Sequence, residues 1–198
     1  MRRIGITGSI ATGKSTLLAA FAKAGVPVFS ADAAVADLYK GEAIAPVEAL
    51  FPGVARDGAI DRQDLARRLA ADPSGFARLE AVVHPLVRAS IARFLDDAEK
   101  EGQALAAVEV PLLFESGHDY GFDAIAVTHV DPAIQKERIL SRPGMSVEKM
   151  QSLLARQMPQ DEKIRRADYI FDMAEPRDVI EERIAALVAT IRAEQEAQ

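Results

Sequence analysis

The chain alternates short, almost wholly apolar runs with longer segments whose apolar residues recur at helical spacing. Segments of amphipathic character, such as residues 16–24 and the segment that ends at Pro143-Gly144, separate several of the short runs. Asp131 is expected to cap the helix before Pro143-Gly144, and Ser146 is expected to open the helix after it. Strands that alternate with helices in this way predict an α/β fold, with a parallel sheet covered by helices on both faces. The five runs of strand length are residues 3–7, 26–29, 104–110, 124–130 and 168–171.

Residues 31–102 break this alternation, because they carry helical patterns and no strand signal. Asp61 and Asp72 are typical helix N-caps, and a further helix is expected to begin at His84-Pro85 and to run to about residue 101. A turn is expected at Asp57-Gly58. We predict that residues 31–102 form a helical insertion within a single domain of residues 1–198. The alternative is a set of extra helices packed against the sheet without a binding role.

The stretch from Gly8 to Ser15 reads Gly-Ser-Ile-Ala-Thr-Gly-Lys-Ser, and it lies between the first predicted strand and the first predicted helix. This order is typical of a phosphate-binding loop, whose backbone N–H groups and helix dipole face phosphate oxygens. Lys14 is expected to reach the β- and γ-phosphates, and the Ser15 hydroxyl to bind a magnesium ion that arrives with the nucleotide. The predicted triphosphate-binding residues are Gly8, Ala11, Thr12, Gly13, Lys14, Ser15 and Thr16.

Composition narrows the possible classes of protein. The chain has 198 residues, no cysteine and three histidines, which excludes disulfides and thiolate chemistry and disfavours a histidine-rich metal site. The formal net charge of −6 argues against a general nucleic-acid binder. No apolar run is long enough to cross a membrane, and the sequence starts directly with a predicted strand. We therefore expect a cytoplasmic protein, with a monomer favoured, that binds neither nucleic acid nor membranes.

Phosphoryl transfer needs an aligned acceptor, a metal and cationic groups around the moving phosphoryl group, and often a base. Asp32 follows the second predicted strand and is a candidate base or metal-linked carboxylate, although it could equally be a helix N-cap. Glu109 lies within the third predicted strand, where P-loop proteins often place a carboxylate near magnesium. His84 could bind a substrate phosphate or hydroxyl, or could cap a helix.

Two arginines, Arg138 and Arg142, are spaced four apart and are expected on one helical face before the Pro143-Gly144 break. Most charges in this region are interpreted as a solvated surface. For Arg142 we favour a role in a mobile lid over the triphosphate, because kinases commonly close an arginine over the donor. The predicted lid region is 138–166.

Several blocks in order resemble the dephospho-coenzyme A kinase family over nearly the whole chain. The opening through Thr16 is similar to the family's P-loop, and Ser30-Ala31-Asp32 stands where the family has Asp-Ala-Asp. The further similar blocks are Asp57-Gly58-Ala59-Ile60-Asp61-Arg62, Leu79-Glu80, His84-Pro85-Leu86-Val87-Arg88, Pro111-Leu112-Leu113-Phe114-Glu115, Arg156-Gln157-Met158, Glu162-Lys163 and Ala167-Asp168-Tyr169.

The resemblance implies a three-layer P-loop kinase fold that uses ATP and Mg²⁺ to phosphorylate the ribose 3′-hydroxyl of dephospho-coenzyme A. It implies that Asp32 acts next to the acceptor hydroxyl and that His84 and Arg88 face the acceptor. The insertion would then bind coenzyme A, and Arg138 and Arg142 would bind ATP from the lid. The sequence departs from the family in two places. Ser30 replaces an acid, and Met173 ends a segment where the family usually has an asparagine that helps border the adenine. The adenine contact must therefore be made differently in this chain.

Three other functions compete with this interpretation. Another P-loop kinase, such as a nucleoside monophosphate kinase, would share the loop and the lid but not the blocks at 84–88 and 111–115. A GTP-binding switch would read guanine through an Asn-Lys-x-Asp element, which a chain without asparagine cannot form. A regulatory ATP-binding module would bind the nucleotide without transferring its phosphoryl group.

Overall fold

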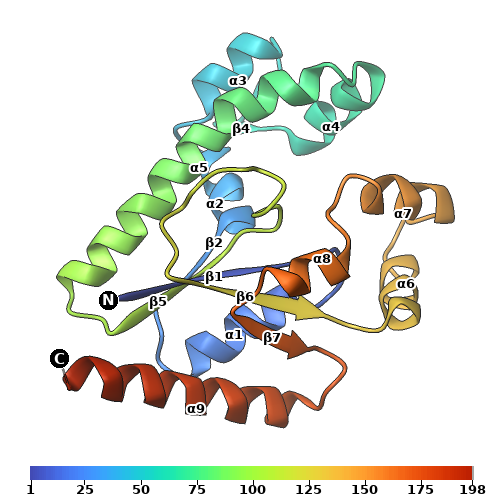
Figure 1. Cartoon of the computed structure of the whole chain (residues 1–198). Coiled ribbons are helices and arrows are strands. Elements are labelled where there is room, and N and C mark those ends of the chain that lie inside the picture. The colour runs from blue at the N-terminus through green and yellow to red at the C-terminus, as the bar shows by residue number, and fades with distance from the viewer. Residues whose placement is uncertain (198) are drawn as a thin grey trace. The chain divides into compact units, whose positions relative to one another are not determined.

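The alternating pattern folds into a five-stranded parallel sheet, as predicted (Figure 1). The structure is a computed structural model and describes residues 1–197. The strand order is β2-β5-β1-β6-β7, so the strand that carries the phosphate loop lies at the centre. The strands are β1 (Arg2–Gly8), β2 (Val28–Ser30), β5 (Leu105–Glu109), β6 (Ala124–His129) and β7 (Tyr169–Asp172).

Helices flank this sheet. α1 (Lys14–Lys23) packs with α9 (Arg177–Glu196) and against β1 and β5, while α8 (Gln160–Arg165) packs against β6. Ile4 and Ile6 alternate along β1 into a buried core that includes Phe21 of α1 and Ile184 of α9. This buried apolar core fixes the central strand, and with it the position of the loop that follows it.

Two further helices follow β6. They are α6 (Pro132–Leu140) and α7 (Val147–Leu154), and each has a side-chain cap that the sequence indicates. Asp131 accepts a hydrogen bond from Ala133 N, and Ser146 accepts one from Lys149 N. The sequence patterns assigned no element to residues 161–166, and α8 covers most of this segment.

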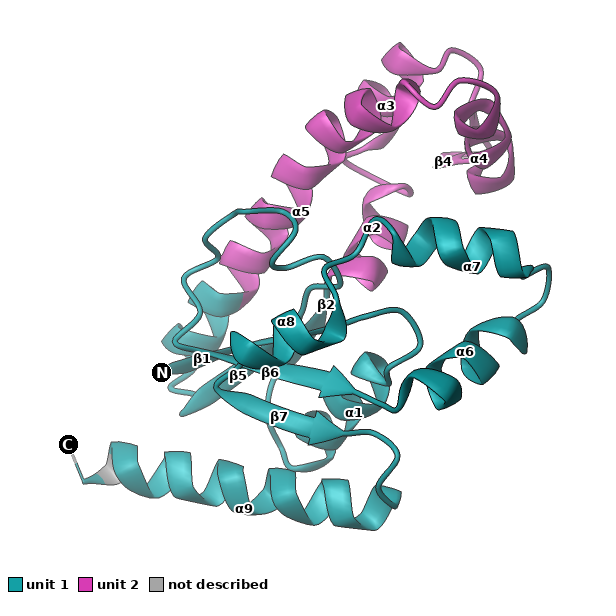
Figure 2. Ribbon diagram, turned by 45° about the vertical axis from the view of Figure 1, so that its right-hand side comes forward, with its two compact units in different colours: residues 1–30, 95–198 teal, residues 31–94 magenta. Residues whose placement is uncertain are grey.

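The chain divides into two compact units, coloured separately in Figure 2. The sheet unit comprises residues 1–30 and 95–198, and the helical unit comprises residues 31–94. The predicted insertion of 31–102 is longer, because the last residues of α5 pack with the sheet unit. The elements of the helical unit are α2 (Ala31–Leu38), α3 (Ile44–Leu50), β3 (Ala55–Arg56), β4 (Ala59–Ile60), α4 (Arg62–Ala71) and α5 (Gly75–Lys100), whose end extends into the sheet unit.

The helical unit corrects two expectations. The expected turn at Asp57-Gly58 joins two short antiparallel strands, β3 and β4, in a segment where no strand was predicted. The helix expected to begin at His84-Pro85 is part of α5, which runs through Pro85 without interruption. Pro85 removes one backbone hydrogen bond, but buried Leu79, Val83 and Val87 hold the helix on both sides of it.

Candidate active site

The phosphate loop needs glycine at its first fixed position for steric reasons. A Cβ atom on Gly8 would lie 2.2 Å from Thr128 Oγ1 and 2.7 Å from the Thr128 carbonyl oxygen. Gly13, the residue before α1, has φ 93° and ψ 21°, a left-handed conformation that favours glycine. The glycines of the motif therefore let the loop pass close to β6 and turn into the helix.

Buried hydroxyl groups hold the loop from inside. Thr12 Oγ1 lies 2.8 Å from the Ser9 carbonyl oxygen, to which it donates, and 2.8 Å from Thr128 Oγ1. Thr128 also donates to the Thr7 carbonyl oxygen at 3.4 Å. The sequence analysis did not identify Thr128, because nothing in its local pattern shows that the strand bearing it lies beside β1.

Lys14 extends along the loop. Its Nζ donates to the carbonyl oxygens of Gly8 and Ser9 at 3.1 and 3.0 Å. Ser15 and Thr16 are exposed in the first turn of α1, where the leading N–H groups have no carbonyl partner within the helix. An ammonium group, hydroxyls and the positive end of a helix dipole thus surround one concave loop, which suits a polyphosphate.

A buried carboxylate lies on the neighbouring strand. Glu109 ends β5, is 4% exposed and accepts a hydrogen bond from Ser30 Oγ at 3.1 Å. Asp32 follows Ser30 closely in sequence, but it belongs to the helical unit, in the first turn of α2. Since α2 begins at Ala31, Asp32 is a first-turn residue rather than the N-cap of this helix. Its predicted chemical role stays a prediction.

The two candidate lid arginines do not share a helical face, contrary to expectation. α6 ends at Leu140, because Pro143 disfavours helical geometry in the residue before it, so Arg142 lies beyond the helix and is exposed. Arg138 remains on α6, and its Nη2 donates to the Met173 carbonyl oxygen at 3.0 Å. The segment after β7 is therefore linked to the helix that precedes the lid.

His84 and Arg88 lie one turn apart on α5, in the helical unit. His84 is exposed and lies in the helix interior, so the alternative that it caps a helix is wrong. Arg88 is partly buried, and among the described residues its Nε has no hydrogen-bond partner. The two side chains can offer an imidazole and a guanidinium group to one anionic ligand, and this role also stays a prediction.

An ion pair that the sequence analysis missed joins the segment after β5 to α8. Lys163 is fully buried, and its Nζ lies 2.8 Å from Glu115 Oε1. Glu115 Oε1 also accepts a hydrogen bond from Met158 N at 2.8 Å. Burial alone would raise the pKa of Glu115, but the bonds from Lys163 and Met158 outweigh it and lower the pKa. In the sequence, Glu115 and Lys163 stand out only because they belong to blocks that resemble those of the family.

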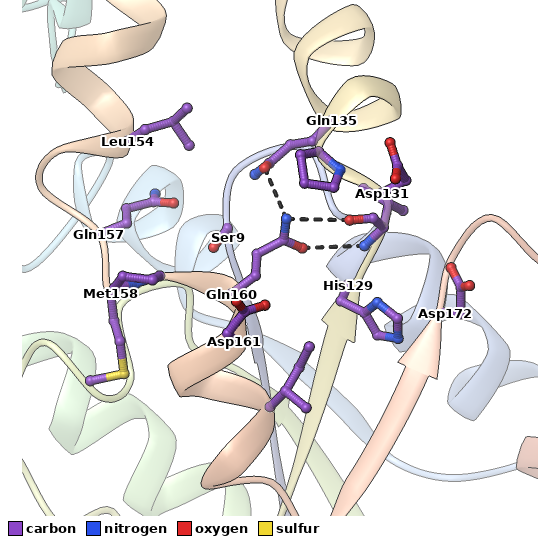
Figure 3. A pocket seen from close by; sticks show the side chains of 14 residues that line it. Ser9, His129, Asp131, Gln135, Leu154, Gln157, Met158, Gln160, Asp161 and Asp172 are labelled. Carbon is purple, nitrogen blue, oxygen red and sulfur yellow. Dashed lines mark hydrogen bonds between the residues drawn. The ribbon is translucent and has the colours of Figure 1, made fainter.

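A cavity of about 620 Å³ lies beside the loop, within the sheet unit (Figure 3). Its lining includes Ser9, the last residues of β6 and β7 (His129 and Asp172), and Gln135, Gln157 and Gln160. Lys14 and Gly13 are not among its lining residues, so the cavity is adjacent to the phosphate cradle and distinct from it. His129, to which the sequence analysis assigned no role, therefore lies close to the loop.

Comparison with known proteins decides the family. The profile described as dephospho-CoA kinase matches residues 2–176. The chain belongs to the dephospho-CoA kinase family. It is 48% identical to a dephospho-CoA kinase of Rhizobium meliloti over 190 residues, which cover 96% of this chain and 98% of that protein.

Solved structures agree with the family's fold. A Thermus thermophilus protein, 33% identical, superposes with a TM-score of 0.78 and coverage of 96% of this chain and 97% of that one. The dephospho-CoA kinase from Campylobacter jejuni, at 24% identity, gives a TM-score of 0.69 with coverage of 96% and 97%, and supports the fold alone. The predicted three-layer P-loop kinase fold is thereby confirmed.

Proposed function

We propose that this member of the dephospho-CoA kinase family transfers the γ-phosphoryl group of ATP to the ribose 3′-hydroxyl of dephospho-coenzyme A. The products are coenzyme A and ADP, which makes this the last step of coenzyme A synthesis. The observation that carries the proposal is a family match over residues 2–176 that includes an intact phosphate loop at the centre of the sheet.

The loop binds the donor. Backbone N–H groups from Ala11 to Thr16 face the phosphates, and Lys14 exchanges the carbonyl oxygens of Gly8 and Ser9 for phosphate oxygens when ATP enters. Phosphate oxygens carry more negative charge than carbonyl oxygens, so the exchange is favourable and strengthens as charge develops during transfer.

Magnesium is part of the proposal as an ion that arrives with ATP. Within residues 1–197, no group of three or more His, Cys, Asp or Glu side chains could hold a metal on its own. The exposed Ser15 hydroxyl would supply one oxygen ligand to a magnesium ion held mostly by phosphates and water, and the buried Glu109 carboxylate would lie near that ion. When bound, the ion neutralises charge on the β- and γ-phosphates.

Asp32 accepts the proton from the acceptor 3′-hydroxyl, or its carboxylate would help to hold a magnesium ion, and both roles require the carboxylate. His84 and Arg88 hold the acceptor's phosphates on the helical unit. Arg138 and Arg142 close over the triphosphate and balance its charge. These assignments rest on the family's pattern at these positions and on the chemistry of the side chains.

Recognition of adenine by the residue-173 side chain is not part of the proposal. Met173 is 6% exposed, and a Cβ on Gly13 would lie 3.1 Å from it, so its side chain packs beneath the loop. In this chain Met173 packs against the loop, and we expect the adenine to be contacted by groups other than the residue-173 side chain. A monomeric state and a cytoplasmic location stay predictions. Across residues 1–197, no helix combines the length and hydropathy that a membrane span requires.

The test is an assay of ADP release with ATP, magnesium and dephospho-coenzyme A, with the product identified by mass spectrometry. Turnover that requires dephospho-coenzyme A and adds one phosphoryl group to its ribose supports the proposal. Turnover with a nucleoside monophosphate instead would favour a different P-loop kinase. Lys14→Ala should abolish activity in either case.

A further inference from the structure

Two glutamine side chains form hydrogen bonds with the backbone N–H and carbonyl groups of one loop residue, Ile10. Ile10 N donates to Gln157 Oε1 at 2.9 Å, and Gln135 Nε2 donates to the Ile10 carbonyl oxygen at 2.8 Å. Gln135 lies on α6 and is 6% exposed, whereas Gln157 lies between α7 and α8. The loop is therefore anchored to α6, just before the predicted lid region, and to the α7–α8 connection within that region.

A third glutamine fixes the orientation of Gln135. Gln160 Nε2 donates to Gln135 Oε1 at 3.0 Å and to the Val130 carbonyl oxygen at 3.3 Å, while Val130 N donates to Gln160 Oε1 at 3.2 Å (Figure 3). The Val130 backbone thus determines which end of the Gln160 amide faces Gln135. Gln135 must then present its NH₂ group to Ile10.

The orientation of the Gln135 amide matters because of the conformation of Ala11, the residue after Ile10. Thr12 N and the Ser9 carbonyl oxygen, 3.4 Å apart, close a four-residue turn in which Ala11 has φ 61°. A positive φ at this position, together with an Ile10 φ that is not positive, is the pattern of a type II turn and normally requires glycine or asparagine at the third residue. An alanine adopts this conformation only where its surroundings hold it there.

The bond from Gln135 acts on the peptide group that distinguishes this turn. The Ile10 carbonyl and the Ala11 N–H belong to one planar trans peptide, so they point in opposite directions. When Gln135 draws the carbonyl toward α6, the Ala11 N–H points away from α6. Loss of the bond would let this peptide flip to the commoner turn, in which alanine is unstrained and its N–H points elsewhere.

We propose that Gln135 is a positioning residue that aims the Ala11 N–H at the donor phosphates, with Gln157 and Gln160 supporting it. The inference rests on the proposed function for the identity of the ligand, but not for the effect on the loop. Gln135 lies just before the predicted lid region of 138–166, and Gln157 and Gln160 lie within it, so the same bonds link that region to the loop.

The experiment measures ADP binding by calorimetry, which needs neither acceptor nor turnover, together with KM for ATP and for dephospho-coenzyme A. Gln135→Met keeps the length of the side chain and removes both hydrogen bonds. We expect ADP affinity to fall about tenfold and KM for ATP to rise in parallel, with KM for dephospho-coenzyme A unchanged. Gln103→Met, at a partly exposed position just before β5 and at the opposite end of β1 from the loop, is the matched control and should change none of these quantities.

A rescue variant separates positioning from general destabilisation. Glycine adopts positive φ without strain, so in an Ala11→Gly background Gln135→Met should weaken ADP binding by much less than tenfold. An equal loss in both backgrounds, or unchanged ADP affinity in folded Gln135→Met, overturns the proposal. If Gln135→Met does not fold, Gln157→Met, at a half-buried position, decides by the same two measurements. Wild-type protein that binds ADP but does not phosphorylate dephospho-coenzyme A would refute the proposed function alone.

Discussion

At the scale of single residues, Gly8 determines whether the phosphate loop can form. Gly8→Ala places a methyl group against the Thr128 hydroxyl and carbonyl, and backbone atoms cannot move aside cheaply. We expect a loss of at least about 2 kcal/mol in the free energy of unfolding and loss of ATP binding. Urea denaturation and calorimetry measure these effects.

Gly58→Ala is the matched control for this prediction. Gly58 also has positive φ, at 76°, but a Cβ there would meet nothing within 4 Å. Its substitution should cost only the backbone strain of about 1 kcal/mol and leave ATP binding intact. A similar loss for both variants would mean that backbone conformation, rather than contact with Thr128, explains the requirement at Gly8.

Asp32 gives the second prediction at this scale. Asp32→Ala should reduce kcat at least about a hundredfold, as expected for a lost general base, while ATP binding survives because Asp32 lies outside the loop. Steady-state kinetics and calorimetry with an ATP analogue test the two halves. A kcat close to that of the wild type would leave Asp32 with no role beyond that of an acidic residue in the first turn of α2.

The sequence predicted those residues whose role is written in a local pattern. Gly8, Gly13 and Lys14 belong to one continuous motif with a mechanism attached to it. Thr128 and Gln135 were missed because they meet the loop through contacts more than a hundred positions away in the chain. Their side chains are common in helices and strands, so only the fold reveals what they contact.

At the scale of elements, the buried pair of Lys163 and Glu115 holds α8 to the segment after β5. Lys163→Met leaves the Glu115 carboxylate, whose side chain is 16% exposed, without its counter-ion. The expected loss in the free energy of unfolding is about 3–5 kcal/mol. Urea denaturation measures it, and replacing both residues (Lys163→Met with Glu115→Leu) should recover much of the loss.

An exposed pair provides the control. Lys100 and Asp97 lie 3.3 Å apart with side chains that are 75% and 68% exposed. Lys100→Met should therefore change the free energy of unfolding by less than about 0.5 kcal/mol. If Lys163→Met is equally mild, the buried pair contributes no more than a surface pair does.

The same pair predicts how stability depends on pH. The pKa of Glu115 is lowered from its ordinary value of 4.5, so below that value the unfolded chain binds a proton more readily than the folded chain. The contribution of Glu115 is present in full above 4.5 and is lost as pH falls through the lowered folded pKa. The stability difference between wild type and Glu115→Gln should shrink over this range in urea denaturation. A difference that does not change with pH would contradict the ionised pair.

Element boundaries were predicted well at three predicted caps, but not at Asp72, which ends α4 while α5 begins only at Gly75, and not where packing overrides a local signal. Asp61, Asp131 and Ser146 begin helices, as their side chains indicate. Pro85 suggested a helix start, but α5 continues through it because buried residues on both sides hold it in place. A local pattern cannot show how much burial is available to offset one lost hydrogen bond.

At the scale of the whole molecule, the sequence predicted five parallel strands but not their order. The order β2-β5-β1-β6-β7 places β1 between strands that begin about a hundred residues later. Apolar runs show that a strand is buried on both faces, yet they do not name its neighbours. The glutamine and threonine contacts of the loop depend on this order, so they could not be predicted either.

The two compact units predict separate responses to the two substrates. If the sheet unit binds ATP and the helical unit binds dephospho-coenzyme A, each ligand should slow amide hydrogen exchange mainly in its own unit. An ATP analogue should protect residues 8–16, and dephospho-coenzyme A should protect segments of residues 31–94, including the part of α5 with His84 and Arg88. At a ligand concentration of 100 Kd, exchange through openings that exclude the ligand should slow about a hundredfold.

Hydrogen-exchange mass spectrometry measures the protection that each ligand gives to the same peptides. The double variant His84→Ala with Arg88→Ala should remove only the protection by dephospho-coenzyme A. Protection of residues 8–16 by dephospho-coenzyme A alone, with residues 31–94 unchanged, would show that the acceptor does not use the helical unit.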